Sequence, residues 1–154
     1  MSILSAAAGS WTGTNGFRLM PGDAFAEFPA TATVTLAAGG HLTSVAYTWQ
    51  HPADGPQEGL LVIGSAGEDG ALTAFWGDSW HQQPTAMSLS GRADPAVALE
   101  AAYGGDWRWR ISLDIPGADE LTLRMDNVIP ASQATDEVAA GPYPAMLMTL
   151  RRRA

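Results

Sequence analysis

Short runs of alternating apolar and polar residues, separated by turn-forming glycines, prolines and aspartates, follow one another along nearly the whole chain. Such alternation puts successive side chains on opposite faces of an extended strand, and closely spaced turns are typical of antiparallel strands that pair with their neighbours in sequence. The pattern predicts an all-β fold of about ten strands, beginning near Gly9 and ending near Arg152. We expect Pro130 to Pro144 to be a long loop, in which residues 132–138 could form one helical turn.

The first hairpin can be aligned residue by residue. A two-residue turn at Gly39-Gly40 pairs Val34 with Val45 and Ala32 with Tyr47. This register collects apolar side chains on one face and small polar ones on the other, as a half-buried hairpin requires.

A second block of strands shares one apolar face. A turn at residues 104–106 pairs Leu99 with Ile111 and Ala101 with Trp109. Neighbouring strands continue this face with Met87, Leu89, Gly91, Leu121, Leu123, Met125 and Asn127. The opposite face alternates in charge, which favours a solvent-facing ladder over a cavity that clamps a carboxylate; its members are Glu100, Arg108, Arg110, Asp114, Arg124 and Asp126.

A third hairpin lies between these blocks, in residues 59–66 and 71–79, and both of its faces are apolar. Leu61, Ile63 and Trp76 share one face, whereas the other carries Leu60, Val62 and Phe75. We expect this hairpin to be covered on both sides, by a lid, an N-terminal segment or the partner in a homodimer. Because ten strands are too many for a small open sheet, the whole pattern predicts one antiparallel meander closed into a β-barrel, a single domain over residues 1–154.

Composition narrows the classes of function. The chain has a formal net charge of −8, no cysteine and no lysine, and its eight basic residues are all arginines. An acidic body disfavours nucleic acid and anionic lipid as partners, and the lack of cysteine excludes disulfides and thiolate-bound metals. No apolar stretch reaches membrane-spanning length, and residues 1–8 lack the basic start of a secretory signal, so we expect a cytoplasmic protein.

The apolar face supplies the candidate ligand-binding residues. It gathers aromatic, thioether and amide side chains, namely Tyr47, Trp49, Met87, Tyr103, Trp107, Trp109, Met125 and Asn127. An amide at an inward position needs a partner, either a neighbour, a water or a ligand. Small residues on this face, such as Ala32 and Gly91, leave room for a ligand or for the aromatic rings themselves. Two interpretations of this face are therefore possible: a ligand pocket, or a filled aromatic core with Asn127 near its rim.

His81 and Asp78 are the candidate catalytic residues. In a regular strand these two positions point to opposite faces, so an acid–base pair requires the chain to turn between them. We favour a histidine at the rim of the barrel over a catalytic base, because a base also needs a pocket and a partner. His41 and His51 are expected to be exposed bystanders, and neither a metal nor a cofactor is predicted.

Two features resemble known families. Gly9-Ser10-Trp11 on the first strand, the meander and the arginines of the last strand resemble the calycin architecture of lipocalins and fatty-acid-binding proteins. The segment Asp78-Ser79-Trp80-His81 also resembles a bacterial calycin-like family of the domain-of-unknown-function kind. The lipocalin resemblance implies that Trp11 packs under Arg151 or Arg152 and closes the barrel; the alternative is a plain core tryptophan beside a frayed arginine tail.

A related resemblance bears on haem binding. The Gly9-x-Trp11-x-Gly13 start is also similar to that of nitrobindin-type haem proteins, which bind haem through a histidine near the C-terminus. This chain has no histidine after His81, so the axial ligand is missing from its expected place.

Three functions are consistent with the sequence. The first is the binding of a small apolar or aromatic molecule inside the barrel, oriented by the aromatic residues and Asn127. The second is an enzyme of the cyclase or isomerase type on the same scaffold, with His81 or Asp78 as its acid or base. The third is an interaction subunit without a ligand, suggested by the two-faced hairpin.

Overall fold

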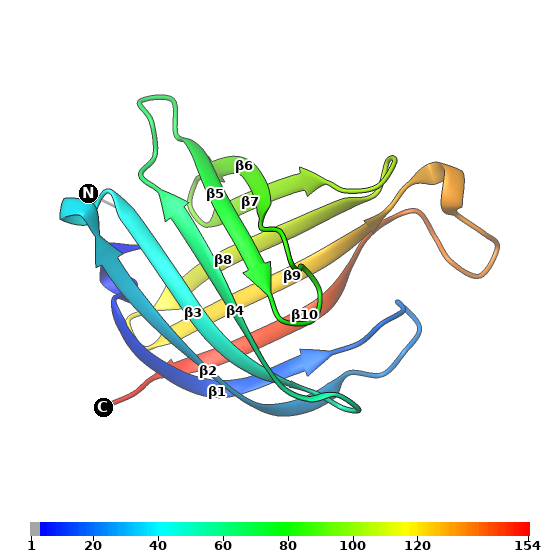
Figure 1. Ribbon diagram of the computed structural model, residues 1–154, viewed down its shortest axis with the longest axis horizontal. Helices are drawn as coiled ribbons and strands as arrows, with labels where there is room; N and C mark the ends of the chain where they lie inside the picture. Colours follow the sequence, from blue (N-terminus) through cyan, green and yellow to red (C-terminus); the bar gives the residue numbers. More distant parts are fainter. Residues whose placement is uncertain (1–3) are drawn as a thin grey trace.

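The computed structural model describes residues 4–154, and in this part of the chain ten antiparallel strands form one closed barrel (Figure 1). Each strand pairs with its neighbours in sequence, and the first pairs with the last. The predictions of an all-β fold and of a closed ten-stranded meander are therefore confirmed. The strands are β1 (Gly9–Phe17), β2 (Ala26–Ala37), β3 (Leu42–His51), β4 (Gly55–Gly64), β5 (Ala71–Asp78), β6 (Met87–Ala93), β7 (Val97–Ala102), β8 (Arg108–Gly117), β9 (Glu120–Ile129) and β10 (Gly141–Arg152).

Three short 3-10 turns interrupt the strands: η1 (Ser5–Ala7), η2 (Ala38–Gly40) and η3 (Ala131–Gln133). The turn η3 lies in the predicted long loop between β9 and β10, but it begins one residue before the expected stretch, and the loop ends four residues early, at Ala140. None of the helices in residues 4–154 is long and apolar enough to span a bilayer.

The first hairpin has the predicted register but a different turn. Val34 pairs with Val45 and Ala32 with Tyr47, as expected. The last pair is Ala37 with Leu42, so the loop holds four residues, 38–41, rather than two. Lengthening a loop by one residue on each side leaves the register unchanged, and Gly39 and Gly40 supply the positive φ angles of 66° and 88° that this loop uses.

The second block is confirmed strand by strand. Leu99 pairs with Ile111, and the next strand places Asn127 opposite Trp109. The charged ladder lies on the outside, where Glu100 contacts the guanidinium Nε atoms of both Arg108 and Arg110. These side chains are substantially exposed, which agrees with the solvent-facing interpretation.

The outer face of the third hairpin is uncovered in the described chain. Leu61 pairs with Trp76 and both are buried in the barrel, as predicted. On the other face, Leu60 is 47% exposed and Phe75 is 59% exposed. Among residues 4–154, then, neither a lid nor an N-terminal segment covers this face, and a homodimer that buries it stays a prediction.

One end of the barrel is filled around Trp11. The buried indole donates from Nε1 to the Ala7 carbonyl at 2.9 Å, and the Arg152 guanidinium lies 4.4 Å from the centroid of the ring. Arg152 also donates to the carbonyls of Ala8 and Ala6, at 2.8 and 2.6 Å. Arg151 points away, exposed and 2.8 Å from a Glu120 carboxylate oxygen. Arg152, rather than Arg151, therefore stacks on Trp11.

Candidate functional site

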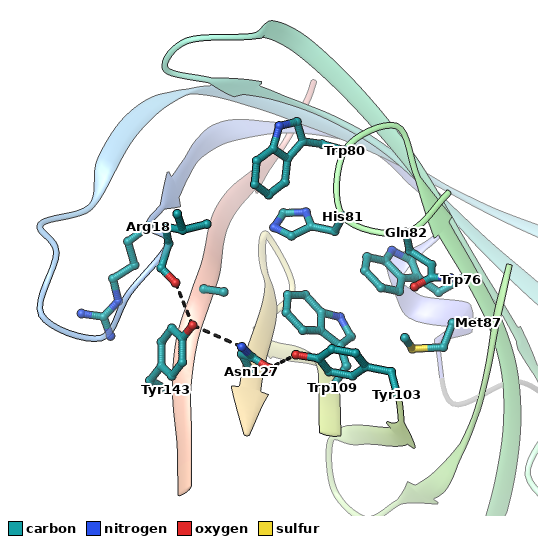
Figure 2. Close-up of a pocket in the computed structure, with 12 residues that line it drawn as sticks. Arg18, Trp76, Trp80, His81, Gln82, Met87, Tyr103, Trp109, Asn127 and Tyr143 are labelled. Atoms are coloured by element: carbon teal, nitrogen blue, oxygen red, sulfur yellow. Dashed lines mark hydrogen bonds between the residues drawn. The ribbon is translucent and has the colours of Figure 1, made fainter. Parts of the chain in front are cut away.

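A cavity of about 220 Å³ opens at the other end of the barrel, where β1 finishes (Figure 2). Four of the predicted ligand-binding residues line it: Met87, Tyr103, Trp109 and Asn127. The catalytic candidate His81 lines it as well. The sequence analysis missed the remaining lining residues, which are Arg18, Leu19, Trp76, Trp80, Gln82, Tyr143 and Ala145.

The other four predicted ligand-binding residues do not line this cavity. Tyr47, Trp49 and Met125 are buried side chains of the core. Trp107 precedes β8 and is only partly buried, packed against the core near the end of its hairpin. The apolar face is thus divided between a cavity and a filled core, because much of it is occupied by its own aromatic rings.

The walls of the cavity are built from stacked aromatic rings. Trp76 and Trp109 stack with centroids 5.4 Å apart and planes 9° from parallel. The imidazole of His81 lies next to them, with centroid distances of 5.3 Å to Trp109 and 4.8 Å to Trp80. In Figure 2 the His81 ring reaches from its loop into the space between Trp80 and Trp109.

His81 reaches this place because the chain turns immediately after β5. The strand ends at Asp78, and Oδ1 of this residue accepts the backbone N–H groups of Trp80, at 2.8 Å, and of His81. The tight turn brings His81 Nδ1 to 3.2 Å from Asp78 Oδ2. The condition set by the sequence for an acid–base pair, a turn between the two residues, is thus present.

The environment of Asp78 favours its ionised form. Burial by itself would raise the pKa of this carboxyl, but the hydrogen bond and the charge of His81, together with the backbone N–H groups, outweigh burial and lower the pKa below its ordinary value. Asp78 is therefore a carboxylate that only accepts hydrogen bonds.

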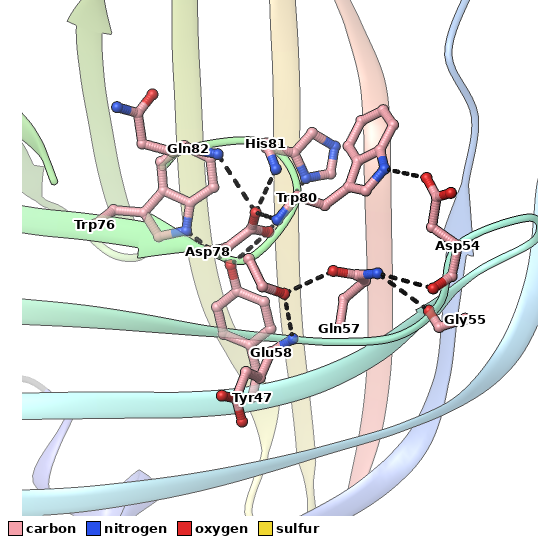
Figure 3. A network of polar contacts seen from close by, with 11 residues as sticks. Tyr47, Asp54, Gly55, Gln57, Glu58, Trp76, Asp78, Trp80, His81 and Gln82 are labelled. Carbon is pink, nitrogen blue, oxygen red and sulfur yellow. Dashed lines mark hydrogen bonds and ion pairs between the residues drawn. The ribbon is translucent and has the colours of Figure 1, made fainter. Parts of the chain in front are cut away.

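Behind Asp78, two more side chains continue the polar network into the core (Figure 3). Trp76 Nε1 donates to the Tyr47 hydroxyl at 2.7 Å, and this hydroxyl donates to Asp78 Oδ2 at 3.3 Å. Burial, and then the negative charge of Asp78, raise the pKa of Tyr47 well above its ordinary value, so the phenol keeps its proton.

Gly59 makes the contact between Tyr47 and Asp78 sterically feasible. In the barrel it pairs with Tyr47 on one side and with Asp78 on the other. A Cβ atom on Gly59 would lie 2.2 Å from both Cζ and the hydroxyl oxygen of Tyr47. The phenol ring thus crosses the inner face of the sheet over a residue that has no side chain.

The opposite wall carries a second hydrogen-bonded chain. Tyr103 donates to Asn127 Oδ1, Asn127 Nδ2 donates to the Tyr143 hydroxyl at 3.2 Å, and Tyr143 donates to the Leu19 carbonyl at 2.7 Å. A carbonyl can only accept, so it fixes the direction of the whole chain. Neighbouring side chains thus provide one partner for the oxygen and one for the nitrogen of the inward amide of Asn127.

His51 is not the exposed bystander that we expected. It ends β3 and stacks on Trp80 at 4.7 Å, and its Nδ1 accepts the backbone N–H of Asp54 at 2.9 Å. Trp80 is anchored in turn by a bond from Nε1 to Asp54 Oδ2, at 2.8 Å. The loop of residues 52–54 folds back over the end of the strand, which strand alternation cannot show.

Some missed residues carried a signal in the sequence. Trp80 belongs to the segment 78–81 that was singled out for its resemblance, and Trp76 shares a face with Leu61. Tyr143 lies between two prolines in a stretch assigned to a loop, so its inward position had no periodic signal.

Within residues 4–154, no three His, Cys, Asp or Glu side chains are grouped so that they could hold a metal ion. The polar groups at the cavity are instead a histidine paired with a carboxylate, the amides of Gln82 and Asn127, two phenols and the Arg18 guanidinium. Models of known protein families and curated protein sequences give no match to this chain.

Proposed function

We propose that this protein binds a small aromatic or apolar molecule in the cavity at the open end of the barrel. The observation that carries the proposal is an enclosure of stacked indole rings, Trp76 and Trp109, with a few polar groups at its edge. Small-molecule sites in proteins have this composition: a mostly apolar, aromatic lining with a small number of placed polar groups.

The size of the cavity suits a compound of one or two rings. An apolar cavity on the order of 150 Å³ accepts benzene, and this one has about 220 Å³. Long-chain lipids are disfavoured because the core below the cavity is filled by Trp49, Met125 and their neighbours.

The calycin resemblance supports the same proposal. Trp11 under Arg152 at the filled end agrees with the arrangement that the resemblance implies, and calycins use the open end of the barrel for ligands. We accordingly infer a calycin-like binding protein, cytoplasmic as its sequence suggests.

Two measurements test the proposal. Native mass spectrometry of protein purified from its own host is expected to show a co-purified mass of a few hundred daltons or less. Titration with naphthalene and with indole is expected to change the tryptophan fluorescence and to raise the melting temperature. The matched variant Trp109→Leu removes one wall of the cavity and is expected to weaken both responses. If neither probe binds and no mass co-purifies, the proposal is wrong.

Catalysis is the second candidate, favoured by one observation: His81 Nδ1 lies 3.2 Å from Asp78 Oδ2 beside the cavity. A base so placed could move a proton between two carbons of a bound ketone. The test is exchange of the acidic C–H protons of 2-tetralone for deuterium, followed by NMR. Faster exchange with the wild type than with His81→Gln supports an isomerase. Equal rates would argue against catalysis and support binding without a reaction.

A further inference from the structure

His81 has one ring nitrogen held by protein and one left for the cavity. Nδ1 lies 3.2 Å from Asp78 Oδ2, whereas no described residue bonds to Nε2. The ring lines the cavity and reaches toward its middle (Figure 2). Building on the binding function above, we propose that the ligand is a weak organic acid, a phenol or an enol, whose hydroxyl group meets His81 Nε2 and gives it a proton.

The network behind His81 fixes which nitrogen accepts. Trp76 Nε1 can only donate, so the Tyr47 oxygen accepts from it and the Tyr47 proton is directed to Asp78. Asp78 receives hydrogens from Tyr47 and from the backbone of Trp80, and an ionised carboxylate has none to give. The proton between Asp78 and His81 therefore sits on Nδ1, which leaves the lone pair of the neutral ring on Nε2.

The proton transfer changes only two bonds. The O–H bond of the ligand breaks, and an N–H bond forms at Nε2. The products are an imidazolium and the ligand anion, and nothing is oxidised or reduced. Asp78 keeps its negative charge throughout and stabilises the imidazolium at 3.2 Å, as in other carboxylate–histidine pairs.

Of the arginines in residues 4–154, only Arg18 lines the cavity, and its Nε and one terminal nitrogen already donate to the carbonyls of Pro144 and Pro21. Its guanidinium also lies 4.4 Å from the Phe25 centroid. The remaining titratable groups around His81 are Asp78, Tyr47, His51 behind the Trp80 ring, and Tyr103 and Tyr143 on the opposite wall. Neutralisation of a bound anion thus falls to His81.

The opposite wall offers a donor for the far end of the ligand. Asn127 has two amide hydrogens, and one of them is used by Tyr143. The second has no acceptor among residues 4–154. A planar acid with a hydroxyl at one end and an acceptor group at the other therefore matches both walls.

The probes are 4-nitrophenol and 4-nitroanisole, which have the same ring and nitro group but differ in the acidic proton. Nitrophenol and its anion absorb at different wavelengths, so the spectrum reports where the proton is. At a pH at which free nitrophenol is mostly protonated, we expect the bound compound to show the spectrum of the anion. We also expect it to bind about ten-fold more tightly than nitroanisole, as one charge-assisted hydrogen bond provides.

His81→Phe is the decisive variant because it keeps a ring among the aromatic neighbours of His81. It is expected to leave bound nitrophenol protonated and to abolish the preference for nitrophenol over nitroanisole. Asp78→Asn is expected to reduce the anion signal because Asp78 acts by positioning His81. His41→Phe, at an exposed position in the loop just before β3, is the matched control and is expected to change nothing.

The outcomes separate the two proposals. If the wild type binds both probes equally, with nitrophenol protonated, the ligand is not recognised as an acid and this inference is wrong, although binding stands. The same holds if His81→Phe keeps the anion spectrum. If the wild type binds neither probe, nor naphthalene nor indole, the binding function itself is wrong. The wild-type spectrum alone decides the inference if a variant does not fold.

Discussion

Replacing Gly59 by alanine is expected to disrupt the support of His81 without touching the cavity. Gly59 lies on β4 between Tyr47 of β3 and Asp78 of β5. Its φ is outside the left-handed region, so an alanine there suffers no backbone strain. The loss of stability on substitution therefore reports how closely the Tyr47 phenol packs over the glycine.

The magnitude follows from the distances. The new Cβ would lie 2.2 Å from Tyr47 Cζ and 2.8 Å from Asp78 Cβ, well inside contact distance, so the phenol must move. Overpacking of this kind costs about 1–3 kcal/mol. Moving the hydroxyl also leaves the buried N–H of Trp76 without its acceptor, for about 1–3 kcal/mol more. We expect the free energy of unfolding to fall by about 4 kcal/mol.

Urea unfolding followed by tryptophan fluorescence measures this loss. With a slope of about 2 kcal/mol/M, the midpoint is expected to fall by about 2 M. Gly77→Ala is the matched control on the adjacent strand, because its Cβ would meet nothing closer than the Gln82 carbonyl oxygen at 3.5 Å; a change within about 0.5 kcal/mol is expected. A Gly59→Ala protein within about 1 kcal/mol of the wild type would refute the reasoning, since Tyr47 could not then cross Gly59 to reach Asp78.

Three further predictions concern the two ends of the barrel. Arg152→Met is expected to lower the free energy of unfolding by about 1–3 kcal/mol, because it removes the contact with Trp11 and three hydrogen bonds to carbonyls. The control Arg151→Met is expected to change this free energy by less than about 0.5 kcal/mol. The urea midpoints of the two variants check the prediction. Asp78→Asn is expected to destabilise the fold most at neutral pH, because folding lowers the pKa of the Asp78 carboxyl. The stabilisation from such a group is fully present above its ordinary pKa of about 3.9 and is lost as the pH falls through the lower folded-state value. The test is the difference in the free energy of unfolding between the wild type and Asp78→Asn, measured at pH 7 and at pH 3. A larger difference at pH 3 than at pH 7 would contradict the prediction. Trp109→Phe is expected to be less destabilising than Trp11→Phe in thermal unfolding, because the Trp109 N–H has no acceptor in the described chain whereas Trp11 loses its bond to Ala7.

The sequence predicted the barrel well because each register follows from local information. Alternation decides which residues of a strand point inward, and the position of a turn decides which residues pair. For this reason the pairs Val34–Val45 and Leu99–Ile111 were right even though the turn between Ala37 and Leu42 was not. A symmetric change in loop length leaves the pairing of the strands as it was.

The site was only partly predictable because its residues lie where strands end. Alternation predicted that Trp49, Trp109 and Asn127 face inward, but it carries no information on depth along the barrel. Depth is set by the stagger of the closed sheet, and it puts Asn127 at the cavity and Trp49 in the core. The turn after Asp78 and the loop that holds His51 have no period to read, so the placement of Trp80 and His81 emerges only from the folded chain.

The polar groups at the filled end of the barrel all have partners, whereas one at the open end does not, and this difference supports the proposed site at the open end. At the filled end, the Trp11 N–H and the Arg152 guanidinium all meet carbonyl oxygens. Among residues 4–154, the buried side-chain polar atoms without a partner belong to Asn15, Trp49 and Trp109. Trp109 lines the cavity, whereas Asn15 and Trp49 are buried without lining it. Each unpaired group lowers the stability of the fold by about 1–3 kcal/mol. Natural proteins retain such local losses of stability mainly at functional sites. At the cavity, a ligand with an acceptor group is therefore expected to supply the partner that the Trp109 N–H lacks.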